Sequence, residues 1–311
     1  MDYEHVPVLA RETVERLNIK EGGAYADGTL GGGGHASLIC EKLAPNALFI
    51  GIDRDREAIE ASKLRLSGYA CGKIFAHTEF SEIKPVLAEH RVGGLDGAVL
   101  DLGVSSRQLD APERGFSYMA CAPLDMRMDA DSRLTARDVV NGYPIKELTR
   151  IISRYGEEKW AGRIAAFIGK ERERRPIENT GDLVRLIKAA IPASARREGP
   201  HPAKRTFQAI RIEVNDELGQ IEKAVDAYAD VLKPGGRLAV ITFHSLEDRI
   251  VKEAFKRREQ PCVCPKDAPA CVCGKVADAK RVNRKPLTPG EDEVSENPRS
   301  RSAKLRVLEK L

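Results

Sequence analysis

The 311-residue sequence has no apolar run that approaches the length of a membrane span, and it is poor in aromatic side chains, with a single Trp. A helix that crosses a bilayer needs about 20 consecutive apolar residues, so we expect no association with membranes. The opening residues Met1–His5 are charged and polar, and no apolar stretch follows them. This pattern predicts a chain without a signal peptide and a cytoplasmic location.

Composition excludes two further classes of protein. A hydrophobic content of 42% is too high for a chain that is disordered throughout, and the length allows one large core or a core with a smaller inserted unit. Seven cysteines in a cytoplasmic protein should stay reduced, so they predict no disulfide framework. The net charge of +4 is unevenly placed, because residues 249–311 hold sixteen Lys or Arg against nine Asp or Glu.

The order of apolar runs predicts an α/β fold. Strand-like runs alternate with helical patterns through the first hundred residues, which is typical of a parallel sheet with crossover helices. The expected strands are 24–27, 49–53, 74–76 and 97–101. We therefore expect a Rossmann-like, mostly parallel sheet.

The middle of the chain predicts an inserted all-helical domain, because the strand alternation stops after Leu102. A long amphipathic helix from Ile210 to Leu232 then leads into a strand at 238–243. The last run, 303–308, alternates like a half-exposed edge strand. We expect one discontinuous domain, residues 1–109 and 206–311, and a helical domain, residues 110–205.

A glycine-rich turn joins the first strand to the next helix. It reads Asp27-Gly-Thr-Leu-Gly-Gly-Gly-Gly-His35, and Asp53 ends the following strand. Such a turn lets a ligand approach bare backbone, and a carboxylate on the next strand can accept the hydroxyls of a ribose. The spacing does not fit the G-x-G-x-x-G dinucleotide fingerprint and suits a site for S-adenosylmethionine better. The alternatives are a flexible linker and a nicotinamide-dependent oxidoreductase.

Motifs along the whole chain resemble the MraW family of bacterial small-subunit ribosomal RNA methyltransferases. The matching segments are His5 with Val8 and Leu9, Asp27–His35, Ile52–Asp55, Leu100–Ser106, Arg114–Ser117, Pro123–Met128, Thr206–Ala209, Phe243–Arg249 and Asn297–Arg299. The resemblance implies a class I methyltransferase that moves a methyl group from S-adenosylmethionine to the N4 amine of one cytidine in the decoding region of 16S rRNA. The implied partner is 16S rRNA or the small ribosomal subunit. We expect the inserted domain to select it, because this domain directly follows the Asp101 loop.

The resemblance also implies the cofactor-binding residues. They are Gly33, Gly34, His35, Asp53, Phe80, Asp101 and Gln108. The amino-acid end of the cofactor would lie on the glycine turn, its ribose on Asp53 and its adenine beside Phe80. Core packing is the alternative role for Phe80.

The loop after the fourth strand holds the candidate catalytic residues. Transfer from a sulfonium is an in-line displacement, so the protein mainly aligns the reactants. We expect Asp101 to bind the cofactor or orient the acceptor amine, with Ser105 or Ser106 near the base; a structural cap of the loop is the alternative role for Asp101. His244 ends a later strand beside the same rim, but a lone histidine there is more often bonded to backbone, so it is not assigned a catalytic role.

Four cysteines, Cys262, Cys264, Cys271 and Cys273, form two C-x-C pairs separated by six residues. Four thiolates suit a structural zinc ion, although such sites more often use C-x-x-C arms. A surface loop of free thiols is the alternative.

Pro261-Cys262 also resembles the nucleophile motif of carbon-five cytosine methyltransferases. However, this motif follows neither the fourth nor the fifth strand.

Basic residues in the second half of the chain are candidate phosphate contacts. The candidates are Lys204, Arg205, Lys280, Arg281, Arg284, Lys285, Arg299 and Arg301. Because few aromatics lie among them, we expect ionic contact rather than base stacking to dominate RNA binding. A solvated surface and a non-enzymatic RNA-binding factor remain alternatives.

Overall fold

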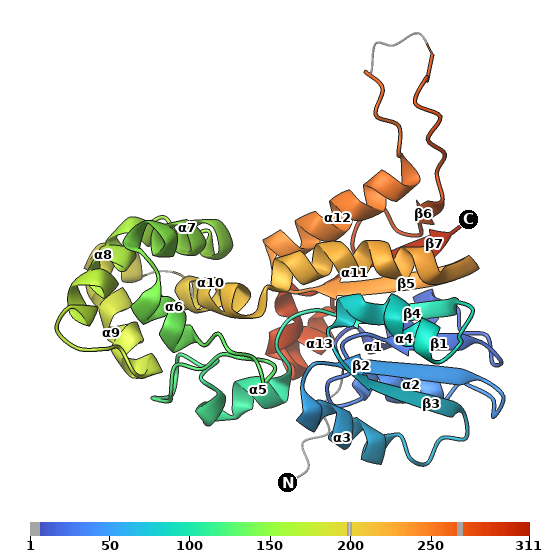
Figure 1. Cartoon of the computed structure of the whole chain (residues 1–311), viewed down its shortest axis with the longest axis horizontal. Coiled ribbons are helices and arrows are strands. Elements are labelled where there is room, and N and C mark those ends of the chain that lie inside the picture. Colours follow the sequence, from blue (N-terminus) through green and yellow to red (C-terminus); the bar gives the residue numbers. More distant parts are fainter. Residues whose placement is uncertain (1–6, 198, 200, 266–269) are drawn as a thin grey trace. The chain divides into compact units, whose positions relative to one another are not determined.

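The computed structural model describes residues 7–197, 199, 201–265 and 270–311 (Figure 1). The chain forms two compact units, a sheet unit of Met1–Gly103 with Leu218–Leu311 and a helical unit of Val104–Glu217. The helical unit begins six residues before the expected range 110–205 and ends twelve residues after it. His5, one of the matched family positions, lies outside the described residues.

The sheet unit contains a seven-stranded sheet with the order β3-β2-β1-β4-β5-β7-β6. The strands are β1 Ala24–Asp27, β2 Leu48–Asp53, β3 Gly72–His77, β4 Leu95–Asp101, β5 Leu232–Thr242, β6 Ala279–Arg281 and β7 Lys304–Lys310. The strands from β3 to β5 in this order pair in parallel, whereas β7 runs antiparallel to both β5 and β6. The predicted mostly parallel α/β fold is therefore confirmed.

Both faces of the sheet are covered by apolar clusters. Successive side chains on a strand point to opposite faces, so neighbouring residues belong to different clusters. On β1, Tyr25 belongs to one apolar cluster and Ala26 to another. On β4, Val99 belongs to the Tyr25 cluster and Leu100 to the Ala26 cluster. The helices of this unit are α1 Ala10–Leu17, α2 Gly34–Cys40, α3 Arg56–Arg65, α4 Ile83–Glu89, α11 Glu217–Val231, α12 Ser245–Glu259 and α13 Glu291–Glu296.

The helix expected from Ile210 to Leu232 was wrong, because the chain forms two helices there. α10 ends at Asn215, and Asp216 adopts a left-handed conformation with φ of 46° before α11 begins. Aspartate tolerates this conformation better than most residues, so neither Gly nor Pro marks the break. The side chain of Asn215 bonds to the backbone of Met126 and Met128, which holds the end of α10 in the helical unit.

The edge-strand prediction for 303–308 was also wrong, because β7 lies between β5 and β6. Leu305, Val307 and Leu308 are buried there. Even the polar position Arg306 is buried, and its guanidinium lies 2.7 Å from the carboxylate of Asp248. An ion pair thus makes an alternating pattern compatible with an interior strand.

The helical unit has one apolar core. Its helices are α5 Ser106–Asp110, α6 Ala136–Gly142, α7 Ile145–Gly156, α8 Ala161–Arg172, α9 Thr180–Ala190 and α10 Lys204–Asn215. Two of the family-like segments pack on each other here, since the Met126 amide donates to the Arg114 carbonyl at 3.0 Å. Across the described ranges, no helix is both long and apolar enough to cross a membrane.

Gly97 tests how tightly the sheet is packed. It pairs with Tyr25 across β1 and β4, and a Cβ at this position would lie 2.7 Å from the ring of the fully buried Tyr25. We expect Gly97→Ala to lower the free energy of unfolding by about 1–3 kcal/mol, because the ring has no room to move. Urea unfolding followed by circular dichroism measures this loss. Gly68→Ala is the control, since its Cβ would meet nothing within 4 Å; equal stability of the two variants would contradict the packing argument.

Candidate functional site

The candidate site lies where the chain order of the parallel strands reverses. From β1 the sheet extends through β2 to β3 on one side and through β4 to β5 on the other. The crevice outside the carboxyl ends of the strands at such a switch point is the usual ligand site of open α/β sheets. Asp27 ends β1, Asp53 ends β2 and Asp101 ends β4, so three carboxylates belong to this edge.

The glycine turn has a backbone that side chains would oppose. Gly31 and Gly33 have φ of 49° and 75°, which only glycine adopts readily. The hydroxyl of Ser62 donates to the Gly31 carbonyl at 2.9 Å, and the guanidinium of Arg65 lies 3.3 Å from the Gly32 carbonyl. Side chains of α3 therefore bind the backbone carbonyls of the glycine turn.

The Asp53 carboxylate holds the same turn from the next strand. One oxygen accepts a hydrogen bond from the Gly31 amide at 2.8 Å, and the other accepts one from the Asp55 amide at 2.8 Å. Burial raises the pKa of Asp53, although these two amides act against that shift. A carboxylate has about four acceptor sites, so Asp53 keeps capacity for further donors such as ribose hydroxyls.

His35 lies among buried acidic groups at the start of α2. Its Nε2 is 3.5 Å from Asp101 Oδ2, and both Asp27 and His35 are almost fully buried. Burial raises the pKa of Asp27 to about 7, while His35 and the Thr29 amide act in the opposite direction. Burial alone would lower the pKa of His35, but Asp101, Asp27 and Glu293 together raise it. The arrangement is a histidine held in an excess of carboxylates.

Three members of this cluster were missed as site residues by the sequence analysis. Asp27 was seen only as part of the motif, although its position at a strand end beside a glycine turn was the available signal. Thr29 accepts a hydrogen bond from the Asp101 amide at 2.6 Å and so connects β1 to β4. Glu293 comes from α13, far along the chain, and also accepts from the Leu9 amide at 2.8 Å; no local pattern announces it.

The other predicted residues lie in different surroundings. Phe80 is 9% exposed and packs in the core cluster with Ile52 and Ile83, so its proposed adenine contact remains a prediction. In the helical unit, Ser105 and Gln108 form a capping box at the start of α5. The side chain of Ser106 lies outside the described part of the structure.

His244 has a structural position that the sequence analysis allowed for. It is the N-terminal cap of α12, where Glu247 accepts hydrogen bonds from the backbone amides of Phe243 and His244.

Some of the basic residues expected to contact RNA phosphates form ion pairs within the protein. Lys280 lies 2.8 Å from Glu309, and Arg281 pairs with Glu259, whereas Arg284 and Lys285 are exposed.

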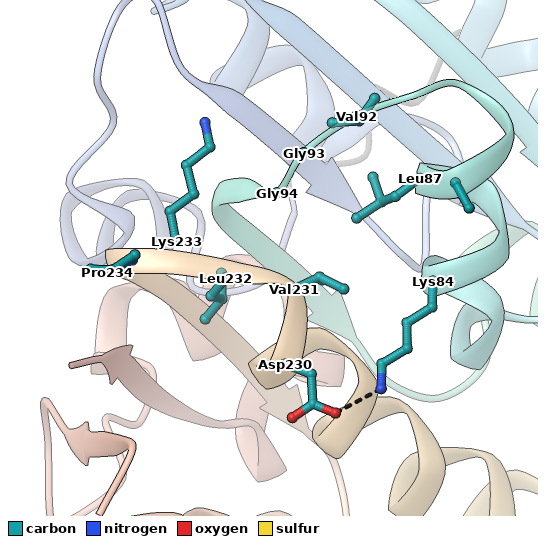
Figure 2. Close-up of a pocket in the computed structure, with 11 residues that line it drawn as sticks. Lys84, Leu87, Val92, Gly93, Gly94, Asp230, Val231, Leu232, Lys233 and Pro234 are labelled. Atoms are coloured by element: carbon teal, nitrogen blue, oxygen red, sulfur yellow. Dashed lines mark hydrogen bonds and ion pairs between the residues drawn. The ribbon is translucent and has the colours of Figure 1, made fainter.

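A cavity of about 490 Å³ lies at the amino ends of β4 and β5, opposite the carboxyl ends that form the candidate site (Figure 2). Lys84, Asp230 and Lys233 lie in its wall, and the first two form an ion pair at 2.7 Å. Because it is remote from the carboxyl ends of the strands, it is not the candidate site.

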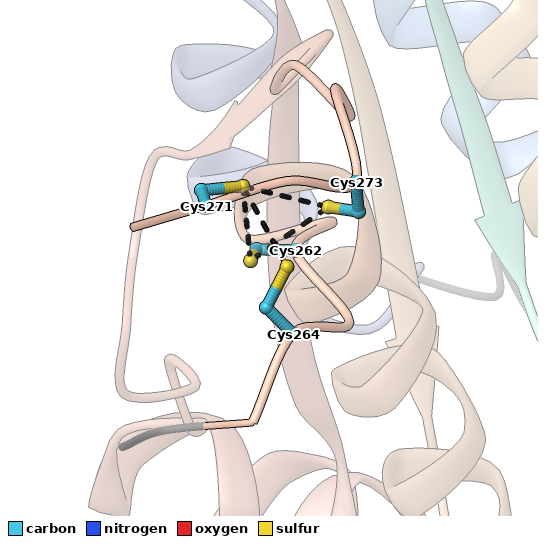
Figure 3. A group of neighbouring side chains, drawn as sticks. All are labelled: Cys262, Cys264, Cys271 and Cys273. Carbon is cyan, nitrogen blue, oxygen red and sulfur yellow. Dashed lines mark hydrogen bonds between the residues drawn. The ribbon is translucent and has the colours of Figure 1, made fainter. Parts of the chain in front are cut away.

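The four predicted metal-ligating cysteines come together (Figure 3). Their sulfur atoms all lie within 4.8 Å of one another, and all four are free thiols. Backbone amides of Lys275 and Val263 lower the pKa of Cys273 to about 6.

Comparison with known proteins gives the family of the chain. The profile of the MraW methylase family matches residues 2–311. The chain belongs to this family. It is 55% identical over its full length to the ribosomal RNA small subunit methyltransferase H of Clostridioides difficile, of which it covers 100%. It is 56% identical to the protein of the same name from Geobacter sp. strain M21, with 100% of this chain and 99% of that protein covered.

Two solved structures with a low sequence identity to this MraW methylase family member also match. A putative rRNA methylase from Clostridium thermocellum is 10% identical with a TM-score of 0.46, covering 99% of this chain and 100% of that one. A putative methyltransferase from Streptococcus mutans, in complex with SAH, is 10% identical with a TM-score of 0.43, covering 99% and 100%.

The buried carboxyl of Asp27 predicts a pH-dependent stability. Its pKa is about 7 in the folded protein and about 4 in an unfolded chain. The folded state therefore holds the proton more tightly, so the free energy of unfolding falls as the pH rises from about 4 to about 7. In Asp27→Asn this loss disappears, and the variant should gain up to roughly 4 kcal/mol relative to the parent over this window.

Urea unfolding at pH 5 and pH 8 measures the part of this difference that falls above pH 5, roughly 3 kcal/mol. Asp138→Asn is the matched control, because hydrogen bonds from Thr135 lower the pKa of Asp138 and its charge does not change between these pH values. A stability difference for Asp27→Asn that is the same at both pH values would show that the buried carboxyl does not titrate there.

Proposed function

We propose that this protein transfers a methyl group from S-adenosylmethionine to the small-subunit ribosomal RNA, at the exocyclic N4 amine of a cytidine, in the cytoplasm. Membership of the MraW methylase family supports methyl transfer. The names of the relatives support the small-subunit rRNA as substrate. The cytidine N4 position rests on the resemblance of the motifs described above.

The observation that carries the choice of cofactor is the charge around the glycine turn. Asp27, Asp101 and Glu293 all act on His35, and Asp53 acts on Asp27. Arg54 acts on Asp53, so the carboxylates outnumber the two cations, His35 and Arg54. A dinucleotide would bring two phosphate charges into this excess of negative charge. S-Adenosylmethionine instead brings a sulfonium and an ammonium against one carboxylate, so it is a net cation, which such a site attracts.

The residues of the sheet unit fit the parts of this cofactor. The amino-acid end would lie along the backbone of Gly33 and Gly34, where no side chain stands between the chain and a ligand. The remaining acceptor capacity of Asp53 would bind the ribose. Asp101 Oδ1 is buried and has no hydrogen-bond partner among the described residues. A buried acceptor without a donor is costly, so this oxygen is suited to an N–H of the cofactor or the acceptor base.

The chemistry needs alignment and an available lone pair. The cytosine N4 lone pair is conjugated with the ring, and a hydrogen bond from the amine to Asp101 would increase its availability. The amine attacks the methyl carbon in line, the S–CH₃ bond breaks, and S-adenosylhomocysteine leaves as the N–CH₃ bond forms. The amine then gives up one proton to solvent or to a carboxylate. The base must leave its stack for this geometry.

The function is tested with small ribosomal subunits from cells that lack the protein. These are incubated with purified protein and S-adenosylmethionine carrying a labelled methyl group, and the digested 16S rRNA is mapped by mass spectrometry. We expect label on one cytidine as N4-methylcytidine. Label on carbon five would overturn the acceptor, and no incorporation would overturn the reaction.

Asp101→Asn tests the role of the carboxylate. We expect the rate of methylation to fall by about 10²-fold, the loss that follows when reacting groups are held out of line. An unchanged rate would exclude a role for the charge of Asp101.

Asp53→Ala tests the cofactor site. It removes the acceptor for the Gly31 amide and for the ribose together, so we expect the affinity for S-adenosylmethionine to fall by at least 10²-fold, as expected for losing two charge-assisted hydrogen bonds of about 1.5–3 kcal/mol each. Isothermal titration calorimetry measures it, with NAD as the competing ligand and Asp292→Ala on α13 as a control. Unchanged affinity in a folded Asp53→Ala protein would remove Asp53 from the site.

A further inference from the structure

The four clustered cysteines have the spacing of a metal site. The Sγ atoms of Cys262 and Cys271 are 3.5 Å apart, as are those of Cys271 and Cys273. The distances from Cys264 to Cys271 and from Cys273 to Cys262 are 3.9 Å and 3.8 Å. Four thiolates about 2.3 Å from a tetrahedral zinc ion have sulfur atoms about 3.8 Å from one another. We propose that Cys262, Cys264, Cys271 and Cys273 bind one zinc ion.

Other uses of four thiols fit these distances less well. Sulfur atoms in a disulfide are about 2.05 Å apart, much closer than any pair here. A cluster of several iron atoms and inorganic sulfides would hold its thiolates farther apart, because the iron and sulfide core lies between them. A single ion at the centre satisfies all four sulfur atoms together.

In the arm that carries these cysteines, the described residues form no apolar core. The arm runs from the end of α12 at Glu259 to the start of β6 at Ala279 (Figure 1), and its described residues form no helix or strand. Its larger apolar side chains face solvent, since Val263, Val272 and Val276 are 67%, 87% and 83% exposed. A segment without a core needs another source of order, and a metal ion is a common one.

Ion pairs fix the base of the arm, whereas none is formed by the described residues of its outer part, 260–265 and 270–277. Glu259 pairs with Arg281, and Asp278 lies 2.6 Å from Arg258 and 2.9 Å from Lys310. These pairs hold the two limbs where they leave the sheet unit. Farther out, the thiols connect the limb of Cys262 and Cys264 with the limb of Cys271 and Cys273 (Figure 3).

The backbone also serves the sulfur atoms. The Val272 amide lies 3.4 Å from Cys264 Sγ as a donor, and such hydrogen bonds stabilise thiolate ligands and fix their direction. Because four cysteines occupy all four coordination positions of a tetrahedral zinc ion, no position is left for water or substrate. The zinc would therefore be structural and not part of the methyl transfer.

Metal content tests the proposal directly. The full-length protein is purified without added metal and analysed by inductively coupled plasma mass spectrometry, and we expect about one zinc per chain for a four-thiolate site. Cys264→Ser should lose most of this zinc, whereas Cys121→Ser, an exposed cysteine outside the cluster, should keep it. Zinc retained by Cys264→Ser would overturn the assignment, as would intact disulfides among the four cysteines.

Cobalt replacement keeps the test independent of variant folding. Zinc is removed from the parent protein by a chelator, and Co²⁺ is added. We expect the intense visible bands of tetrahedral cobalt and thiolate-to-cobalt charge transfer in the near ultraviolet, both reversed by zinc. Trypsin should also cut after Lys275 faster in the apo protein than in the zinc form. A parent protein that neither carries zinc nor gives the tetrahedral cobalt spectrum would overturn the proposal.

Discussion

The hydrogen bond from the Gly31 amide to the Asp53 carboxylate is the constraint on which the site depends. It connects the turn after β1 to the end of β2, and its length is 2.8 Å. A turn with two left-handed glycines has little intrinsic preference for one shape. Asp53 on one side and Ser62 on the other therefore define the conformation of this turn, and the Thr29 hydroxyl extends the connection to β4.

The same edge of the sheet carries a desolvation cost that the protein does not fully offset. Asp27 is 1% exposed and is surrounded by other carboxylates. Neither ring nitrogen of His35 has a hydrogen-bond partner within standard geometry among the described residues. Unsatisfied buried groups of this kind cost free energy and concentrate at functional sites. A cationic ligand that supplies N–H donors would relieve both the charge excess and the missing hydrogen bonds.

Much of the fold could be predicted because apolar runs in parallel sheets are continuous. The run at 24–27 became β1 and the run at 49–53 lies within β2. What could not be predicted depends on contacts between distant residues. At the break before Asp216, Asn215 bonds to the backbone of Met126 and Met128. On the interior strand β7, Arg306 donates to Asp248.

The candidate site was predictable to the same extent and for the same reason. Glycines and carboxylates at strand ends are local signals, so Gly33, Asp53 and Asp101 could be named from their places in the chain. Whether a side chain is already engaged is not a local property. Phe80 lies in the core and Ser105 is committed to the cap of α5, and neither fact can be read from neighbouring residues.

The two additions to the sheet unit follow one rule of chain topology. The helical unit begins after β4 and returns before most of α11, and the cysteine arm begins after α12 and returns at β6. Both leave the sheet unit between elements, where a longer connection costs little because loop-closure entropy grows slowly with length. They differ in the interactions that offset the conformational entropy lost when each segment becomes ordered. The helical unit buries its own apolar core, whereas the arm exposes its valines and brings its thiols together instead, so a bound ion would have to supply the order that packing supplies elsewhere.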